Sequence, residues 1–267
     1  MSAAFRRAAT NFHFTTLPAR TACARMPTLA TRFPPPFRGI PLCALPPEVS
    51  DALDDLRAGR EKIITLIPST STSLSAPTDV RVLRGAPSPR PRPVILSGSF
   101  NPPHAGHIAL LDRGVAAASP SEPATPFAEL AIVNADKGTL PHDDVTRRLL
   151  WLLGLPMPVI VTMSPLFVDK AVLVPGAAFV MGYDTAVRLL RPDYYASREV
   201  MEETLGGLLA QGCTFVVGGR VDCEGVFRTL NMEEVPVELR GLFRTLSEET
   251  FRQDISSTQL RGQAARS

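Results

Sequence analysis

The stretch Gly98-Ser-Phe-Asn-Pro-Pro-His-Ala-Gly-His107 decides the fold, because it lies between an apolar run at 93–97 and a helical pattern at 108–115. This order predicts a strand, a glycine turn and a helix start that carries His104 and His107 on one face. The first N–H groups of a helix have no partner within the helix, and the helix dipole favours negative charge there. Both imidazoles can then face one phosphate group. The stretch therefore predicts a nucleotide-phosphate site at the end of a strand.

A metal site is a weaker interpretation of the same residues. The chain has four histidines, and two of them fall within these ten residues, which also argues against ordinary surface or core histidines. The four cysteines contain no C-x-x-C pair, and no H-E-x-x-H helix is present, so a zinc site is not expected. The sequence predicts no metal-ligating residues.

The pattern along the chain predicts an α/β fold, with a parallel sheet that is covered by helices on both faces. Short apolar runs alternate with amphipathic segments after residue 93, and ligands of such sheets bind at the carboxyl ends of the strands. The C-terminal part, 235–265, reads as helical apart from 251–255. Strands are expected at 94–97, 127–133, 159–162, 177–181 and 214–217, and helices at 105–117, 143–153, 184–191 and 198–210.

The composition predicts one domain with an N-terminal appendage. With 267 residues and 45% hydrophobic content the chain can bury one good core. The predicted organisation is a targeting or disordered segment at 1–45, a short extension with a Pro-rich linker at 46–92, and the main domain at 93–267. The net charge of +2 and the low aromatic content do not favour nucleic-acid binding. No apolar stretch approaches the roughly 20 residues needed to span a bilayer, so no membrane partner is expected.

The first 47 residues contain no Asp or Glu, whereas arginine recurs among Ser, Thr and Ala. That composition is typical of a transit peptide for a mitochondrion or plastid. A disordered basic tail, or a start assigned too far upstream, would have the same composition and would leave a cytoplasmic protein. The scattered cysteines favour a reducing compartment.

Two motifs identify a resemblance. GSFNPPHAGH at 98–107 resembles the G-x-F-x-P-x-H-x-G-H motif of the nucleotidyltransferase (cytidylyltransferase-like) superfamily, and in particular of nicotinamide and nicotinate mononucleotide adenylyltransferases. Asp254-Ile-Ser-Ser-Thr-Gln-Leu-Arg261 resembles the I-S-S-T-x-[IL]-R motif of the same superfamily. The likeness covers residues 93–265 and a Rossmann-like domain, with weaker matches at 134–137 and 182–184.

The resemblance implies an enzyme that transfers AMP from ATP to a phosphorylated acceptor and releases pyrophosphate. The expected acceptor is nicotinamide or nicotinate mononucleotide, which would give NAD or its deamido form. The implied cofactor is Mg²⁺, and the implied partners are ATP and the small-molecule acceptor. Homo-oligomers are common in that superfamily.

The resemblance also implies roles for individual residues. His104 and His107 match the catalytic histidines that contact the nucleotide phosphates. The remaining matched positions are nucleotide-binding in the superfamily: Gly98, Ser99 and Phe100 in the turn, Gly106 at the helix start, Gly182 and Asp184 in a G-x-D element, and Ser256, Ser257, Thr258 and Arg261 in the second motif.

The positions of four further residues indicate their environments. Lys137 follows an expected strand end and could hold a phosphate, although a solvated loop lysine fits equally. Lys170 and Arg191 read as surface charges. The single tryptophan, Trp151, lies on an apolar helix and reads as core, although the resembled adenylyltransferases commonly place tryptophans around the acceptor ring.

Two alternatives to an adenylyltransferase stay open from the sequence. One is a cytidylyltransferase that acts on a phospho-alcohol, because the sequence does not show the contacts that select the base. The other is a non-transferring protein on the same fold that binds or hydrolyses ATP.

Overall fold

The computed structural model describes residues 44–69, 79–134, 138–155, 157–222, 224–252, 255 and 257–264. The predicted targeting segment therefore lies outside the described residues, apart from its last two positions. In the described part, no helix has the length and apolar character that crossing a membrane requires.

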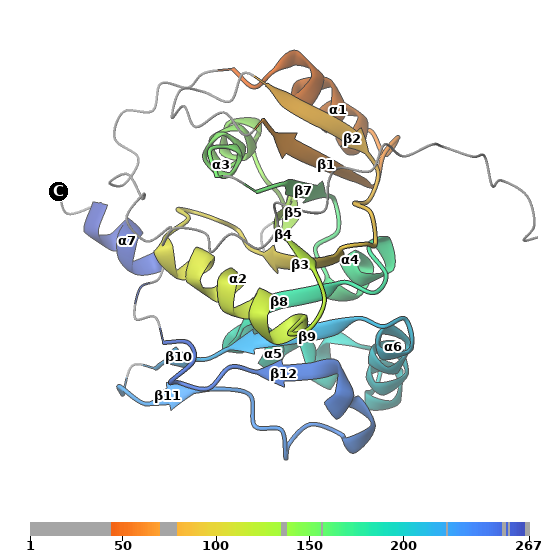
Figure 1. Ribbon diagram of the computed structural model, residues 1–267, viewed down its shortest axis with the longest axis vertical. Helices are drawn as coiled ribbons and strands as arrows, with labels where there is room; N and C mark the ends of the chain where they lie inside the picture. Colours follow the sequence, from red (N-terminus) through yellow and green to blue (C-terminus); the bar gives the residue numbers. More distant parts are fainter. Residues whose placement is uncertain are drawn as a thin grey trace, which may run out of the picture.

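The centre of the protein is an eight-stranded, mostly parallel sheet in the order β12-β9-β8-β3-β4-β7-β1-β2 (Figure 1). The strands from β12 to β7 are parallel, whereas β1 is antiparallel to both β7 and β2. The bounds are β1 Ile63–Pro68, β2 Val80–Arg84, β3 Arg92–Ser97, β4 Ala124–Ala131, β7 Val159–Thr162, β8 Ala178–Gly182, β9 Thr214–Gly218 and β12 Phe243–Thr245. The predicted α/β fold is confirmed, and it is Rossmann-like.

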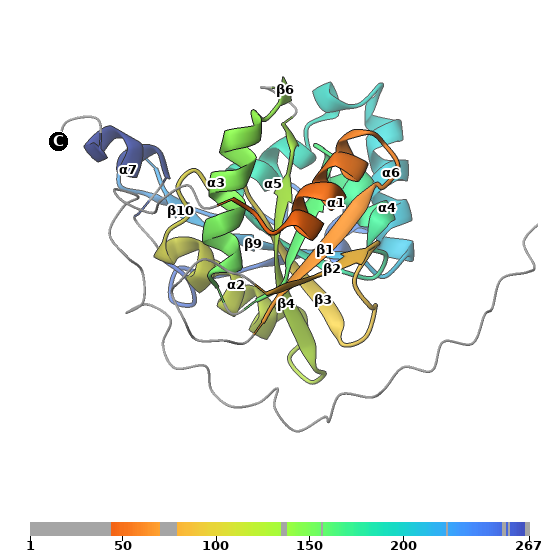
Figure 2. The ribbon, with the colours of Figure 1, turned by 90° about the horizontal axis from the view of Figure 1, so that it is seen from above.

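Helices cover both faces of this sheet, as Figure 2 shows from above. Strand residues alternate between two hydrophobic clusters, as the period of two in a β-strand requires. One cluster includes α1, α2 and α3, and the other includes α4, α5, α6 and η3. The bounds are α1 Pro47–Arg57, α2 Ala105–Ala118, α3 His142–Leu153, α4 Phe167–Leu173, α5 Tyr183–Leu189, α6 Arg198–Ala210, α7 Ser257–Ala264, η2 Pro192–Tyr194 and η3 Val237–Leu242.

Two short antiparallel pairs complete the described structure. Strand β5 (Val133–Asn134) pairs with β6 (Gly138–Thr139), and β10 (Arg220–Val221) pairs with β11 (Phe227–Arg228). The first pair follows β4 and the second follows β9, so both pairs lie beyond the carboxyl ends of strands of the main sheet.

The region at 46–92 differs from the expected extension and linker, because it contributes β1 and β2 to the main sheet and α1 to the hydrophobic cluster on one of its faces. Residues 63–66 are all buried, and β1 pairs with β7. A short apolar run does not distinguish a buried strand from the end of a helix by periodicity alone, and pairing with β7 decides between them. Among the described residues of this region, the segment at 85–91, between β2 and β3, connects elements in the way that a linker does.

The prediction of a helical C-terminal region at 235–265 is wrong for residues 243–250, whereas η3 and α7 are helical. Residues 246–250 contain no helix. Residues 243–245 form strand β12, which extends the sheet parallel to β9. The Phe243 ring packs on the Phe215 ring with centroids 5.6 Å apart, and both residues are buried. Burial against the sheet therefore outweighs the local helical pattern.

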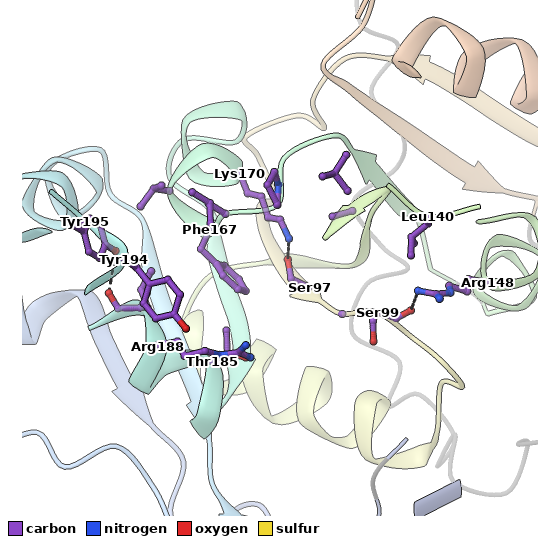
Figure 3. Close-up of a pocket in the computed structure, with 17 residues that line it drawn as sticks. Ser97, Ser99, Leu140, Arg148, Phe167, Lys170, Thr185, Arg188, Tyr194 and Tyr195 are labelled. Carbon is purple, nitrogen blue, oxygen red and sulfur yellow. Dashed lines mark hydrogen bonds between the residues drawn. The ribbon is translucent and has the colours of Figure 1, made fainter. Parts of the chain in front are cut away.

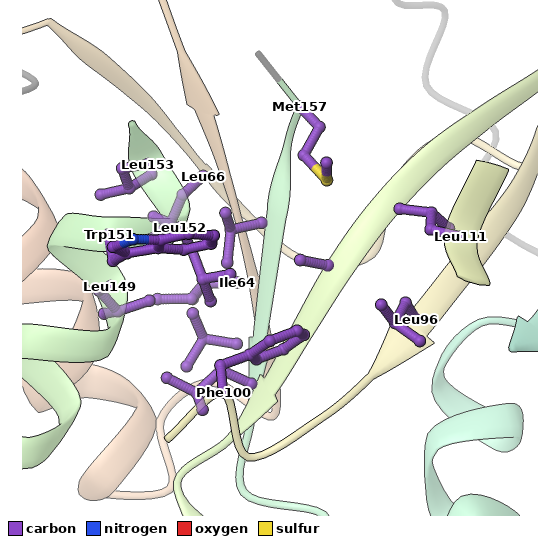
Figure 4. Packing of buried hydrophobic residues seen from close by; sticks show 14 of the residues in the cluster. Ile64, Leu66, Leu96, Phe100, Leu111, Leu149, Trp151, Leu152, Leu153 and Met157 are labelled. Carbon is purple, nitrogen blue, oxygen red and sulfur yellow. The ribbon is translucent and has the colours of Figure 1, made fainter. Parts of the chain in front are cut away.

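The tryptophan expected in the core lies there. Trp151 is 9% exposed on α3 and belongs to the cluster that also contains Leu66 and Leu149 (Figure 4). It is therefore a packing residue of the sheet face covered by α3.

The order of the parallel strands determines where a ligand can bind. After β3 the chain builds β4 and β7 on one side, and it then crosses to β8, β9 and β12 on the other side. In open α/β sheets this reversal opens a crevice at the carboxyl ends of the two diverging strands. The loop at 98–104 follows β3 and α5 follows β8, so both lie at this crevice.

Candidate functional site

The two histidines lie together at the start of α2. His104 precedes the first helical residue, and its ring centroid is 3.8 Å from that of His107. The backbone N–H of His104 donates to Nδ1 of His107 at 3.1 Å. Because Nδ1 accepts this bond, the proton of the neutral His107 ring is on Nε2, which becomes a donor. Within the described residues, the buried Nδ1 of His104 has no hydrogen-bond partner.

Both rings are uncharged at neutral pH. Burial, and to a smaller extent the adjacent His104 ring, lowers the pKa of His107 to about 3. Burial also lowers the pKa of His104. The helix start therefore offers N–H groups and the positive end of the helix dipole to an anion.

The C-terminal motif reaches the same loop. Ser257 Oγ donates to the carbonyl oxygen of Pro102 at 2.7 Å, and Arg261 donates to the carbonyl oxygen of Asn101. Figure 1 shows α7 beside the first turn of α2. The tertiary structure therefore brings together two motifs that lie about 150 residues apart in the sequence.

Gly106 leaves room for the ring of His104 and for this C-terminal segment. A Cβ at Gly106 would be 2.9 Å from His104 Nδ1 and 3.2 Å from Ile255 Cγ2. Its closest neighbours are thus protein atoms of the two motifs. Gly106 allows these motifs to approach each other.

The Phe100 side chain fixes the loop to the hydrophobic core. Its φ of 45° lies in the left-handed region, which is uncommon for a residue other than glycine. The side chain is 2% exposed and points into the core, with its ring centroid 5.1 Å from that of His107 (Figure 4). A Cβ at Gly98 would be 3.0 Å from the Phe100 ring. Glycine at position 98 therefore leaves room for the Phe100 ring to turn back against the end of β3.

A cavity of about 370 Å³ opens beside the loop (Figure 3). Ser97, Gly98 and Ser99 at the end of β3 contribute to its lining, together with Phe167 and Lys170 of α4. Its volume is in the range of about 300–1,000 Å³ that is typical of small-molecule sites. The cavity lies at the crevice that the strand order predicts.

Lys170 corrects the expectation of a surface charge. It is 6% exposed, and its Nζ donates to Glu129 Oε2 at 2.8 Å and to Ser97 Oγ at 3.4 Å. Ser97 and Thr162 also donate to the Glu129 carboxylate, at 2.6 and 2.7 Å. A glutamate within the apolar strand run at 127–131 was the signal in the sequence, since buried glutamates are nearly always paired. Arg191, by contrast, is exposed as expected and pairs with Asp193 at 2.6 Å.

Arg148 is a second residue that sequence reasoning missed. It is 7% exposed, lines the cavity and donates to the carbonyl oxygen of Ser99 at 2.9 Å. Its buried Nε has no hydrogen-bond partner among the described residues. Burial lowers the pKa of Arg148, and the like charges of Arg147 and Arg261 add to that shift. Arg148 also pairs with Asp144 at 3.3 Å, so it offers the cavity an N–H donor while its charge is partly balanced.

The G-x-D element occupies a different position. Gly182 is the exposed N-cap of α5, and the Asp184 carboxylate pairs with Arg220 rather than lining the cavity. The next turn of α5 does reach the cavity, through Thr185 and Arg188. The element therefore lies at the crevice, with its carboxylate directed to β10.

Three predicted site residues cannot be placed in this arrangement. Lys137 and Ser256 lie outside the described residues, as does the side chain of Thr258. Across the described ranges, no group of three or more His, Cys, Asp or Glu side chains could hold a metal ion. The described side chains therefore offer no set of protein ligands for Mg²⁺.

Comparison with known proteins adds no assignment. No model of a protein family matches the chain, and no curated protein matches it in sequence. The fold and the crevice define a Rossmann-like α/β protein with a cavity at its topological switch point. The motifs and the site geometry carry the functional proposal.

Proposed function

We propose that this protein is a nucleotidyltransferase that transfers AMP from ATP to a phosphorylated small molecule. The leading acceptors are nicotinamide and nicotinate mononucleotide, which would give NAD or its deamido form. The observation that carries the proposal is the meeting of the histidine loop and the C-terminal motif beside a cavity, through the Ser257–Pro102 and Arg261–Asn101 contacts.

The reaction needs no covalent enzyme intermediate. An oxygen of the acceptor phosphate attacks the α-phosphorus of ATP in line, and one P–O bond forms. The bond from the α-phosphorus to the bridging oxygen breaks, and its electron pair leaves with pyrophosphate. The protein needs to position both phosphates and to stabilise the charge that spreads over their oxygens.

The described residues supply donors for this task. His107 Nε2–H and the first N–H groups of α2 are suited to the α-phosphate, and Arg261 adds charge at the same loop. The buried Arg148 Nε is suited to the acceptor phosphate between the cavity and the loop. Mg²⁺ would be carried by the ATP phosphates and water, which is its common mode of binding.

The test is pyrophosphate release by the full chain with Mg²⁺ and either ATP or CTP. The acceptors are nicotinamide mononucleotide, nicotinate mononucleotide, phosphocholine, phosphoethanolamine and phosphopantetheine, and the matched control omits the acceptor. We expect acceptor-dependent pyrophosphate release with ATP and a pyridine mononucleotide. Acceptor-dependent pyrophosphate release with CTP but not with ATP would instead favour a cytidylyltransferase. Release of phosphate from ATP at the same rate with and without every acceptor would overturn group transfer in favour of ATP hydrolysis.

A further inference from the structure

Lys170 lines the cavity, and the buried Glu129 pairs with it from behind the lining. Both Glu129 oxygens accept hydrogen bonds, one from Thr162 and the other from Ser97 and Lys170. The side chains of Glu129 and Lys170 are 2% and 8% exposed. The pair therefore contributes no net charge, and the carboxylate has no accessible oxygen without a partner.

Lys170 retains a donor for a ligand. An ammonium has three N–H groups, and within the described residues Glu129 and Ser97 accept two of them. The Nζ atom also lies 5.0 Å from the centroid of the Phe167 ring, which lines the same cavity. Figure 3 shows Lys170 and Ser97 pointing toward each other in the middle of the lining.

The two sides of the cavity offer different donors. Arg148 pairs with Asp144 at 3.3 Å and keeps a buried Nε without a partner among the described residues, whereas the Lys170 charge is balanced by the buried Glu129. The Nε–H of Arg148 is suited to a phosphate. A carboxylate next to Lys170 would share one ammonium with Glu129 in a poorly solvated place, where repulsion between like charges is strong. A carbonyl oxygen would accept the remaining N–H without that repulsion.

The lining also indicates the shape of the group. Phe167, Tyr194 and Tyr195 contribute aromatic rings to the cavity, and such rings favour flat partners. Tyr195 is held by a hydrogen bond from its hydroxyl to the carbonyl oxygen of Leu189 at 3.0 Å. A planar ring is therefore suited to the space between the aromatic side chains and Lys170.

We propose that the Glu129–Lys170 pair makes the acceptor site selective for a ring that carries an uncharged carbonyl or amide group, against one that carries a carboxylate. This inference rests on the proposed function, because it assigns the cavity to the acceptor. Lys170 is then a specificity-determining residue that touches the acceptor, and Glu129 acts through it.

The test is calorimetric binding of two probes of equal shape to the full chain at pH 7.5. Nicotinamide mononucleotide carries a carboxamide, and nicotinate mononucleotide carries a carboxylate. We expect the wild-type protein to bind the amide at least about tenfold more tightly, a difference of about 1.4 kcal/mol. In Glu129→Gln the Lys170 charge is no longer balanced, so the preference should shrink to about twofold or reverse. Glu203→Gln, an exposed change on α6, is the matched control and should keep the wild-type ratio.

The outcomes separate the two proposals. Equal binding of both probes to the wild-type protein, or tighter binding of the carboxylate, overturns the selectivity even if Glu129→Gln does not fold. A folded Glu129→Gln variant with the wild-type ratio also overturns it. If either result comes with acceptor-dependent pyrophosphate release, group transfer stands. If neither probe binds and no acceptor releases pyrophosphate, both proposals fail.

Discussion

Two polar clusters lie at neighbouring strand ends of this protein, and they differ in how their hydrogen bonds are satisfied. Around Glu129 and Lys170, each carboxylate oxygen has a partner, and the charges cancel. Around the histidine loop, His104 Nδ1 and Arg148 Nε are buried without hydrogen-bond partners in the part of the chain that the structure describes.

The difference indicates which cluster has buried polar atoms that a bound ligand would satisfy. Buried polar atoms without partners cost stability, so proteins keep them mainly where a ligand or another function compensates for that cost. The satisfied cluster instead resists added charge, because a new charge would disturb a balanced pair. We therefore expect changes in the satisfied cluster to act on stability and on the choice of acceptor, and changes in the open cluster to act on the rate of transfer.

The largest expected effect is on folding. Lys170→Met leaves the Glu129 carboxylate buried without its cation, and loss of one partner of a buried pair costs about 3–5 kcal/mol. Urea unfolding measures the free energy of unfolding. The double variant Glu129→Gln/Lys170→Met should recover much of the loss, since neither charge remains. If Lys170→Met were as stable as the wild type, the Glu129–Lys170 ion pair would not contribute to the free energy of unfolding.

The next largest effect is on transfer. His107→Ala removes the Nε2–H donor, and loss of one such donor lowers kcat by about 100- to 1,000-fold. ATP binding should weaken much less, because α7 and the helix start remain. His107→Gln keeps an N–H donor and should retain more activity than His107→Ala. Wild-type turnover of His107→Ala would remove His107 from the proposed mechanism.

The open cluster also predicts a pH dependence of stability. The pKa of His107 is about 3 in the folded protein, against 6.5 for an unperturbed histidine. Between those values the unfolded chain binds more protons, so stability is present above pH 6.5 and is lost as the pH falls toward 3. His107→Gln lacks this titration, so its Tm should fall less than that of the wild type from about pH 7 to about pH 4. Parallel Tm curves would contradict the burial of a neutral ring.

A smaller effect is expected where the two motifs touch. Gly106→Ala places a Cβ against His104 and Ile255, and such overpacking costs about 1–3 kcal/mol. We expect transfer to fall by about tenfold as the His104 ring shifts. Gly207→Ala on α6 is the control, because no described atom outside its own helix turn and chain neighbours lies within 4 Å of its Cβ, and it should leave transfer unchanged. Equal activity of the two variants would contradict the contact.

The smallest effect should come from the tether of α7. Ser257→Ala removes one hydrogen bond to the loop, worth about 0.5–1.5 kcal/mol, so the KM for ATP should rise by about two- to tenfold. Ser119→Ala removes a comparable bond, 2.9 Å long, at the far end of α2 and should leave the KM unchanged. Steady-state kinetics with varied ATP distinguish the two. An unchanged KM in Ser257→Ala would separate α7 from the nucleotide.

The sequence by itself determined the parallel α/β core and the histidine loop, because both depend on local patterns. Apolar runs of strand length alternate with helical segments, and the stretch at 98–107 contains its own turn and helix start. Even the core role of Trp151 followed from the apolar helix around it.

Only the tertiary structure decided the membership of β1 in the sheet, the strand at 243–245 and the burial of Lys170. Each depends on a partner far along the chain: β7 for β1, Phe215 for Phe243 and Glu129 for Lys170. A lysine on a short helix such as α4 reads as solvated until the Glu129 carboxylate on β4 is brought within 2.8 Å of it. The histidine loop is specified by residues that are adjacent in the sequence, so the local pattern located it. Lys170 and its partner Glu129 are brought together only by the folded chain, so the local pattern could not locate that part of the cavity.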